Sequence, residues 1–166
     1  MKFLHTILSG YVVAAFFVMG IAAWHLLRKS HPVFFRKSFR MAAVFGLASS
    51  LLIFGIGDFH AAEVAKTQPT KLAAMESVWE TERGVPLYLI VLPDVKNERN
   101  AIEFIGIPKV TSYLAYRDFN AEVKGLKAFP AQDRPPLMEV FVSFRLMVML
   151  GTLFLVLSAL AVYLSW

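Results

Sequence analysis

Two side chains in a polar stretch of the chain, Lys71 and Glu76, have the residue types that proton-coupled chemistry needs. They lie five residues apart in the segment QPTKLAAMES. A carboxylate near water can accept a proton, and an ammonium group can donate a hydrogen bond to an oxygen atom of a substrate. On a helix this spacing puts them on neighbouring faces, where a charge pair contributes about 0.5 kcal/mol or less. The residue types alone therefore leave open both a substrate site and a surface charge pair.

Three residues of the terminal apolar segments have the types that hold a haem. His5 lies near the start of the chain, where an ionisable group at membrane depth is unfavourable unless it is paired or reaches water. Met147 lies between Ser143 and Gly151, one turn away on either side. Arg145 needs an anionic partner in apolar surroundings, and a haem propionate would supply one. An interfacial histidine and a packing methionine are the plainer alternatives.

The depths of His5 and Met147 allow the two to act together. At about 1.5 Å per residue, His5 lies about 35 Å from Arg28, and Met147 lies about 29 Å from Trp166. The two side chains could then reach opposite faces of one macrocycle. An iron held by histidine and methionine is six-coordinate and low-spin, so it accepts electrons but has no open position for oxygen.

A second polar cluster, Asp58, His60 and Glu63, follows the second apolar segment. It could form a proton exit or a polar collar that closes a helix end. A metal site that joins His60 to His5 is a weaker alternative, because the two histidines lack a ligand-spaced motif.

Three apolar stretches, Phe3–Leu27, Met41–Gly57 and Leu137–Trp166, must position these side chains. The chain has 166 residues, 57% of them hydrophobic, and a mean hydropathy of +0.58. A membrane-spanning helix needs about 20 apolar residues. The first stretch is too long for a signal peptide, and its positive charge follows it. We predict an all-α, polytopic membrane protein with spanning helices at 3–28, 39–57 and 137–166, a short basic loop at 29–38 and a long loop at 58–136.

The distribution of charge predicts how the chain is oriented. The segment Arg28–Arg40 carries five Lys and Arg residues and no acid, whereas residues 58–136 carry ten basic and eleven acidic residues. Short basic loops stay in the cytoplasm, so the long loop is expected outside. The net charge of +5 is therefore a topology signal, and we predict no nucleic-acid partner. The absence of cysteine excludes disulfides, zinc-thiolate sites and iron–sulfur clusters.

Within the long loop, the sequence predicts one helix over Lys71–Trp79 with Thr70 as its N-cap. Tyr88–Leu92 is either a short strand or a buried extended piece, and its periodicity cannot decide. The remainder is rich in proline and glycine, and we expect irregular structure packed on the membrane surface.

Three long strings of the sequence carry a resemblance to a known family: KFLHTILSGY, GDFHAAEVAKTQPTKLAAMESVWET and GLKAFPAQDRPPLMEVFVSFRLMV. In order and spacing they resemble the central part of subunit I of cytochrome bd-type quinol oxidases. The resemblance covers essentially the whole chain. It implies that His5 and Met147 are the axial ligands of the low-spin b-type haem, with Arg145 beside it. It also implies that Lys71 and Glu76, with Gln68 in the same block, serve quinol oxidation.

The chain departs from the family in the number of its helices. Helices that hold the high-spin haem b and haem d of a complete subunit have no counterpart, so this fragment alone is not expected to reduce oxygen. The resemblance implies a part of a respiratory quinol:oxygen oxidoreductase in the bacterial inner membrane, its long loop on the periplasmic or extracellular side. Its expected partners are lipid, quinol, the remaining helices of subunit I and a subunit II. A haem-free structural or assembly protein and a quinone-binding sensor stay open as alternatives.

Overall fold

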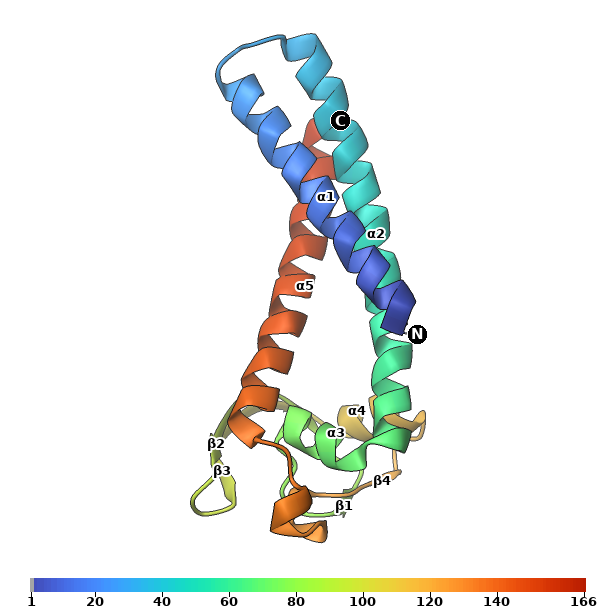
Figure 1. Ribbon diagram of the computed structural model, residues 1–166, viewed down its shortest axis with the longest axis vertical. Coiled ribbons are helices and arrows are strands. Elements are labelled where there is room, and N and C mark those ends of the chain that lie inside the picture. The colour runs from blue at the N-terminus through green and yellow to red at the C-terminus, as the bar shows by residue number, and fades with distance from the viewer. Residues whose placement is uncertain (1) are drawn as a thin grey trace. The chain divides into compact units, whose positions relative to one another are not determined.

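The computed structural model describes residues 2–166, which fall into two compact units. The helical unit comprises the chain up to Gly57 together with Val148–Trp166, and the loop unit comprises Asp58–Met147. Two long helices each contribute residues to both units, so the boundaries between the units fall inside helices (Figure 1).

Three helices are long and apolar enough to cross a membrane: α1 (Lys2–Leu27), α2 (Pro32–Thr67) and α5 (Leu137–Ser165). This confirms the prediction of a mostly helical protein with three membrane-spanning segments. In hydrocarbon the backbone must satisfy its hydrogen bonds internally, so a spanning segment of this kind is one continuous helix. A long apolar run in the sequence is therefore enough to predict it.

The predicted ends of the second helix, 39 and 57, are wrong at both sides. Helix α2 begins at Pro32 and runs to Thr67. Proline is tolerated in the first turn of a helix, where its missing N–H group needs no partner, so Pro32 starts the helix instead of breaking it. The basic connection shortens to a tight turn in which Lys29 and His31 have positive φ angles. Asp58 and His60 therefore lie within a helix and not at its end.

Small residues let the helices of the helical unit approach closely. A Cβ atom added at Gly46 of α2 would lie 3.1 Å from the Cβ atom of Ala15 and 3.8 Å from that of Ser158. Around it, Met19, Ala42 and Ala43 form a small buried core. Close backbone approach through small residues is a common mode of helix packing in membranes.

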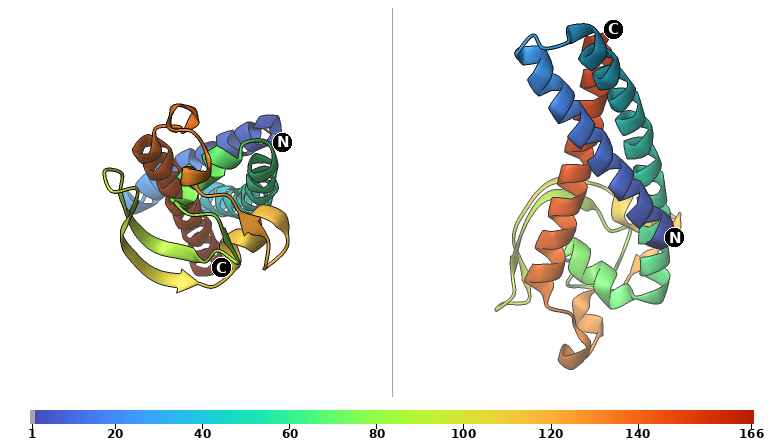
Figure 2. Two further views of the ribbon diagram at one scale, coloured as in Figure 1. Left: turned by 90° about the horizontal axis from the view of Figure 1, so that it is seen from below. Right: turned by 45° about the horizontal axis from the view of Figure 1, so that its top comes forward.

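The loop unit contains short helices and two antiparallel strand pairs. Its elements after α2 are α3 (Pro69–Glu76), β1 (Glu82–Arg83), β2 (Leu87–Asp94), β3 (Arg99–Ile107), α4 (Val110–Tyr116), β4 (Glu122–Val123), η1 (Leu126–Ala128) and η2 (Ala131–Asp133). Strand β1 pairs with β4, and β2 pairs with β3 in a hairpin (Figure 2). The strand alternative for Tyr88–Leu92 is confirmed. The expectation of irregular structure elsewhere is wrong for β3 and α4. Strand β3 forms because it pairs with β2, and α4 packs against residues far from it in the chain, so neither could be recognised from its own sequence.

Helix α3 contributes to two small cores of the loop unit. Ala73 and Ala74 pack in a cluster with Trp79, Leu126 and Phe141, whereas Leu72 packs in a second cluster. The second cluster also contains Ala65, Val85, Ala115 and Val123. A short helix that is buried on two sides has little freedom to rotate, so the residues at its ends have defined positions.

Candidate functional site

The first turn of α3 carries Gln68 and Lys71, and both are exposed. The N-cap is Gln68 and not Thr70 as predicted, and Pro69 occupies the first turn. The prediction failed because Pro69 can enter the helix, which moves the helix start back by two residues. The Gln68 side chain makes no capping hydrogen bond.

The last residue of α3, Glu76, forms an ion pair with Arg145 of α5. Oε2 of Glu76 lies 2.7 Å from Nη2 of Arg145, and the two side chains are only 12% and 23% exposed. Nη1 of Arg145 donates a 2.7 Å hydrogen bond to the backbone oxygen of Tyr88. Arg145 thus joins the end of α3, the start of β2 and α5. The anionic partner that the sequence required for Arg145 is present within the loop unit as a carboxylate.

Burial changes the proton affinity of Glu76. Desolvation raises the pKa of this carboxyl from 4.5 to about 7, and the positive charge of Arg145 opposes part of that rise. A group with a pKa near neutrality can both take up and release protons under physiological conditions. Perturbed groups of this kind are enriched at functional sites.

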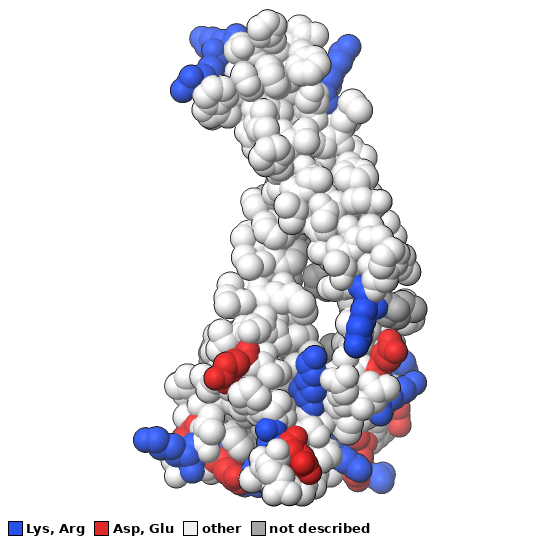
Figure 3. All heavy atoms as spheres, viewed as in Figure 1, with Lys and Arg blue, Asp and Glu red and all other residues white. Residues whose placement is uncertain are grey.

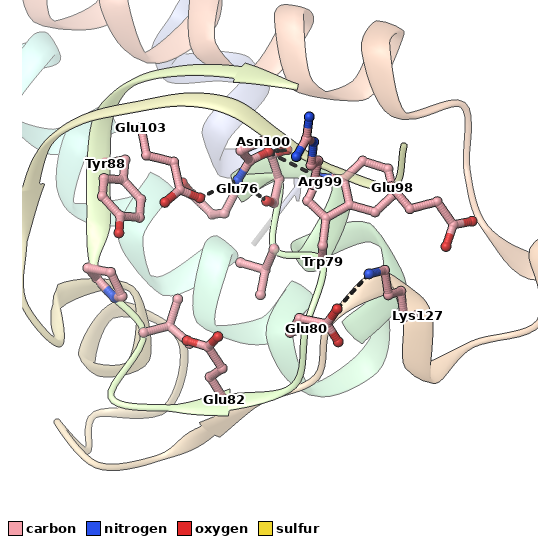
Figure 4. Close-up of a pocket in the computed structure, with 14 residues that line it drawn as sticks. Glu76, Trp79, Glu80, Glu82, Tyr88, Glu98, Arg99, Asn100, Glu103 and Lys127 are labelled. Atoms are coloured by element: carbon pink, nitrogen blue, oxygen red, sulfur yellow. Dashed lines mark hydrogen bonds and ion pairs between the residues drawn. The ribbon is translucent and has the colours of Figure 1, made fainter. Parts of the chain in front are cut away.

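Glu76 lines a polar cavity of about 300 Å³ (Figure 4). The cavity lies between the chain that follows α3, the β2–β3 hairpin and η1. Tyr88 and Glu103 lie on the hairpin side, and Glu80 forms an ion pair with Lys127 on another side. Neither Lys71 nor Gln68 lines it. The structure thus brings Glu76 and Arg145 together but leaves Lys71 and Gln68 on the exposed start of the same helix.

The cavity contains residues that the sequence reading missed. Tyr88, Asn100 and Glu103 come from the hairpin, and Trp79 from the segment after α3. Asn100 and Glu103 lie in a stretch with no recognisable motif. Only the pairing of β2 with β3 brings them to Glu76, so no local signal could have identified them.

The two residues with haem-ligand chemistry belong to different units. His5 is half-buried in the helical unit, where a Cβ atom added at Gly57 would lie 3.5 Å from Cε1 of its ring. The backbone of α2 therefore passes close to this imidazole. Met147 belongs to the loop unit, and its side chain is 51% exposed.

The Asp58, His60 and Glu63 cluster is explained in part by an ion pair. Both carboxylate oxygens of Asp58 accept hydrogen bonds from the guanidinium group of Arg117, which follows α4. Within residues 2–166, no group of three His, Cys, Asp or Glu side chains is arranged to hold a metal ion.

Comparisons with known proteins agree with this architecture. The family model described as cytochrome bd terminal oxidase subunit I matches residues 1–166. The chain is 39% identical over 147 residues to cytochrome bd-II ubiquinol oxidase subunit 1 of Escherichia coli (strain K12), which covers 88% of this chain and 28% of that protein. It is 36% identical over 170 residues to cytochrome bd ubiquinol oxidase subunit 1 of Bacillus subtilis (strain 168), with 96% and 36% covered.

A solved structure of bd oxidase from Geobacillus thermodenitrificans is also similar. It matches with a TM-score of 0.84 and 30% sequence identity, over 95% of this chain and 36% of that one. The chain therefore spans only 28% to 36% of the length of these relatives. Because the family model covers the chain from end to end, the chain belongs to the cytochrome bd terminal oxidase subunit I family.

Proposed function

We propose that this chain forms the electron-entry part of a cytochrome bd-type quinol oxidase. Quinol is oxidised at the loop unit, where Glu76 accepts a proton from a quinol hydroxyl group. Oxidation of a hydroquinone releases two electrons and two protons, so a proton acceptor must stand beside the bound head group. The names of two similar proteins contain the words ubiquinol oxidase, which supports the substrate class.

The observation that carries this proposal is the environment of Glu76. Its carboxyl is buried, paired with Arg145 and adjacent to a polar cavity, and its pKa is about 7. A surface carboxylate with an ordinary pKa would be a much weaker proton acceptor at neutral pH. Arg145 holds the ionised form in place, because its guanidinium group faces the carboxylate and is itself fixed to the backbone at Tyr88.

Lys71 and Gln68 have a different part in the proposal. Both are exposed at the start of α3, and neither lines the cavity beside Glu76. We assign them to hydrogen bonds with the quinol oxygen atoms as the head group approaches the loop unit. The ammonium group of Lys71 and the side-chain amide of Gln68 both have hydrogen-bond donors for that purpose.

A haem b is the cofactor that the family implies, and we propose that residues of this chain hold it. His5 would supply an imidazole and Met147, which is exposed, a thioether, and we propose this pair as the protein ligands of the haem iron. Nε of Arg145 is buried and has no hydrogen-bond partner among residues 2–166, which leaves one donor for a propionate. When bound, a haem b would supply a one-electron acceptor for the electrons of quinol.

Three apolar helices require partners in a complete enzyme. Each has long exposed apolar faces, which we propose are covered by lipid, by the remaining helices of a subunit I and by a subunit II. The high-spin haem b and haem d would belong to those other helices. The acid-free turn between α1 and α2 supports a cytoplasmic position, with the loop unit on the outer side of the bacterial inner membrane.

The quinol site is tested by Glu76→Gln and its matched control Glu80→Gln in the assembled oxidase. Glu80 lines the same cavity, but it is exposed and paired with Lys127. Glu76→Gln should slow quinol oxidation by about 100-fold, the usual contribution of a general base. Oxidation of an artificial electron donor should stay close to that of the parent. An equal loss with both donors, or an equal loss in both variants, would contradict the assignment.

The haem ligands are tested by optical spectroscopy. Membranes that contain the chain, prepared with ample haem, should show sharp low-spin b-type bands on reduction. Met147→Leu should convert them to a high-spin spectrum, whereas Met149→Leu, an exposed methionine two residues along α5, should leave them unchanged. A colourless preparation would favour a haem-free structural protein, and a preparation that binds quinone without turnover would favour a sensor.

A further inference from the structure

Asn100, in the first part of β3, makes four side-chain hydrogen bonds within the loop unit. Its Oδ1 accepts one from Oγ of Ser77 at 2.7 Å and one from Nε1 of Trp79 at 3.0 Å. Its Nδ2 donates one to the backbone oxygen of Ser77 at 3.0 Å and one to Oε1 of Glu103 at 2.7 Å. An amide side chain has two acceptor and two donor positions, so all of them are used.

These bonds hold the residue that directly follows Glu76. Ser77 is 1% exposed and has a left-handed backbone conformation with φ 55°, which ends α3. A left-handed conformation is unfavourable for a residue other than glycine and persists only where the surroundings hold it. Asn100 binds both the hydroxyl and the carbonyl group of Ser77, and it also holds the indole of Trp79 two residues further on. The end of α3 is thus attached to the hairpin through one side chain.

We propose that Asn100 is the positioning residue of the Glu76 site, which keeps the carboxyl of Glu76 buried against Arg145. The effect of Asn100 on quinol oxidation rests on the proposed function, whereas its effect on the position of Glu76 does not. Without Asn100, Ser77 would lose two hydrogen bonds and the indole of Trp79 would lose one. The backbone after Glu76 would then relax, and water would reach the carboxyl. Glu76 forms its ion pair with Arg145, whereas the hydrogen bonds of Asn100 go to Ser77, Trp79 and Glu103, so Asn100 acts through the chain that it fixes.

Several charged groups surround Glu76 and bear on its titration. Arg145 of α5 faces it directly. The cavity beside it is also lined by two ion-paired carboxylates, Glu80 with Lys127 and Glu98 with Arg134. The remaining charged or titratable groups that line it are Tyr88, Glu103, Arg99 and Glu82. Loss of the Asn100 amide changes no charge among these groups. A change in the pKa of Glu76 would therefore report its exposure to water.

The experiment is an infrared titration of the full chain in lipid, with the C=O band of protonated Glu76 identified by its loss in Glu76→Gln. The midpoint in the parent chain should lie near 7. In Asn100→Ala it should fall by at least one pH unit, toward 4.5, the ordinary value. Asn97→Ala is the matched control, because Asn97 lies on the same hairpin but bonds only to the exposed Asp94. Its midpoint should equal that of the parent.

Ser77→Ala is a second, milder variant that removes one of the four hydrogen bonds and no other group. It should shift the midpoint in the same direction by a smaller amount, which keeps the test valid if Asn100→Ala does not fold. An unchanged midpoint in both variants would overturn the proposal.

Quinol oxidation by the assembled oxidase separates this inference from the proposed function. If Glu76 is the proton acceptor, the pH profile of quinol oxidation should move with the infrared midpoint in Asn100→Ala. If the midpoint moves while Glu76→Gln oxidises quinol at the parent rate, Asn100 still positions Glu76, but the proposed function is wrong.

Discussion

The helical unit and the loop unit handle charge in opposite ways. Every acidic residue of the chain lies in the loop unit, and none lies in the helical unit. The loop unit forms ion pairs from widely separated elements, among them Arg145 with Glu76, Arg134 with Glu98 and Arg83 with Glu122. Figure 3 shows Lys and Arg alone at the α1–α2 turn but both signs over the loop unit.

Two arginines of the helical unit have partners other than carboxylates. The guanidinium group of Arg28 lies 4.0 Å from the ring centroid of Trp24. Arg40 donates a hydrogen bond through Nε to the backbone oxygen of Ser165, 2.5 Å away. A unit without carboxylates can sit in hydrocarbon at low cost, since charges at membrane depth are unfavourable. All the side-chain carboxyl groups thus lie in the loop unit, whereas the charged side chains of the helical unit are all cations.

Among the substitutions that test this difference between the two units, one at Gly125 of the loop unit should have the largest effect. A Cβ atom there would lie 2.4 Å from the backbone oxygen of Trp79 and 2.4 Å from the backbone carbon of Glu80. Backbone atoms cannot move aside, so Gly125→Ala should destabilise the loop unit by about 3 kcal/mol or more. Limited proteolysis within residues 58–147 measures the loss. Gly10→Ala, with nothing within 4 Å of the added atom, should behave like the parent.

Gly46 tests the packing of the helical unit and should have the next largest effect. The nearest atom to an added Cβ is the Cβ of Ala15 at 3.1 Å, so a larger side chain would force α1 and α2 apart. Gly46→Leu should cost about 1–3 kcal/mol, the usual range for overpacking. Thermal unfolding followed by circular dichroism in lipid measures it. Gly20→Leu is the control, because nothing lies within 4 Å there, and equal losses in both variants would contradict close packing at Gly46.

Arg145→Gln tests the charge coupling inside the loop unit. Arg145 lowers the pKa of Glu76, so its removal should raise that pKa further above 7. Glu76 must be deprotonated to accept a proton, and the rise of quinol oxidation with pH should therefore move to more alkaline pH. A shift of one pH unit corresponds to about 1.4 kcal/mol. Rate measurements from pH 5 to 9, a span of about two units on either side of neutrality, detect the change. A shift to acid pH would contradict the coupling.

The smallest effect is expected for the exposed pair Arg83 and Glu122. Their side chains are 77% and 49% exposed, with a separation of 3.7 Å. Exposed pairs contribute about 0–1 kcal/mol and are screened by salt. Glu122→Gln should change the stability of the loop unit by about 0.5 kcal/mol or less in denaturant titrations. A much larger loss would mean that surface charge, and not the buried clusters, stabilises the loop unit.

Part of the fold could be read directly from local sequence. Three apolar stretches predicted three helices, because their length and composition alone make them suitable for a membrane. Helix ends were less predictable. Pro32 could break a helix or start one, and Thr70 could cap a helix that in fact begins at Pro69. Both helix starts depend on which backbone N–H and C=O groups form hydrogen bonds. Those bonds depend on how the neighbouring segments fold, which the residues around each proline do not show.

The candidate site, too, could be predicted only in part from local sequence. Glu76 was predicted as a proton acceptor from its residue type and from the family resemblance of the string around it. Arg145 was expected to need an anion, but its carboxylate partner lies 69 positions away in the chain. Asn100 had no signal at all, because its role arises only from the pairing of β2 with β3.

From the order of its amino acids one can predict which segments can enter a membrane, where the charges lie and which side chains are candidates for contact with quinol and haem. Those properties are sums over neighbouring residues, so they do not depend on the rest of the chain. The burial of Glu76 beside Arg145 and the contact of Asn100 with the end of α3 arise only when the chain folds. Burial and ion pairing are properties of surfaces brought together from distant parts of the chain, and the pKa of Glu76 follows from them.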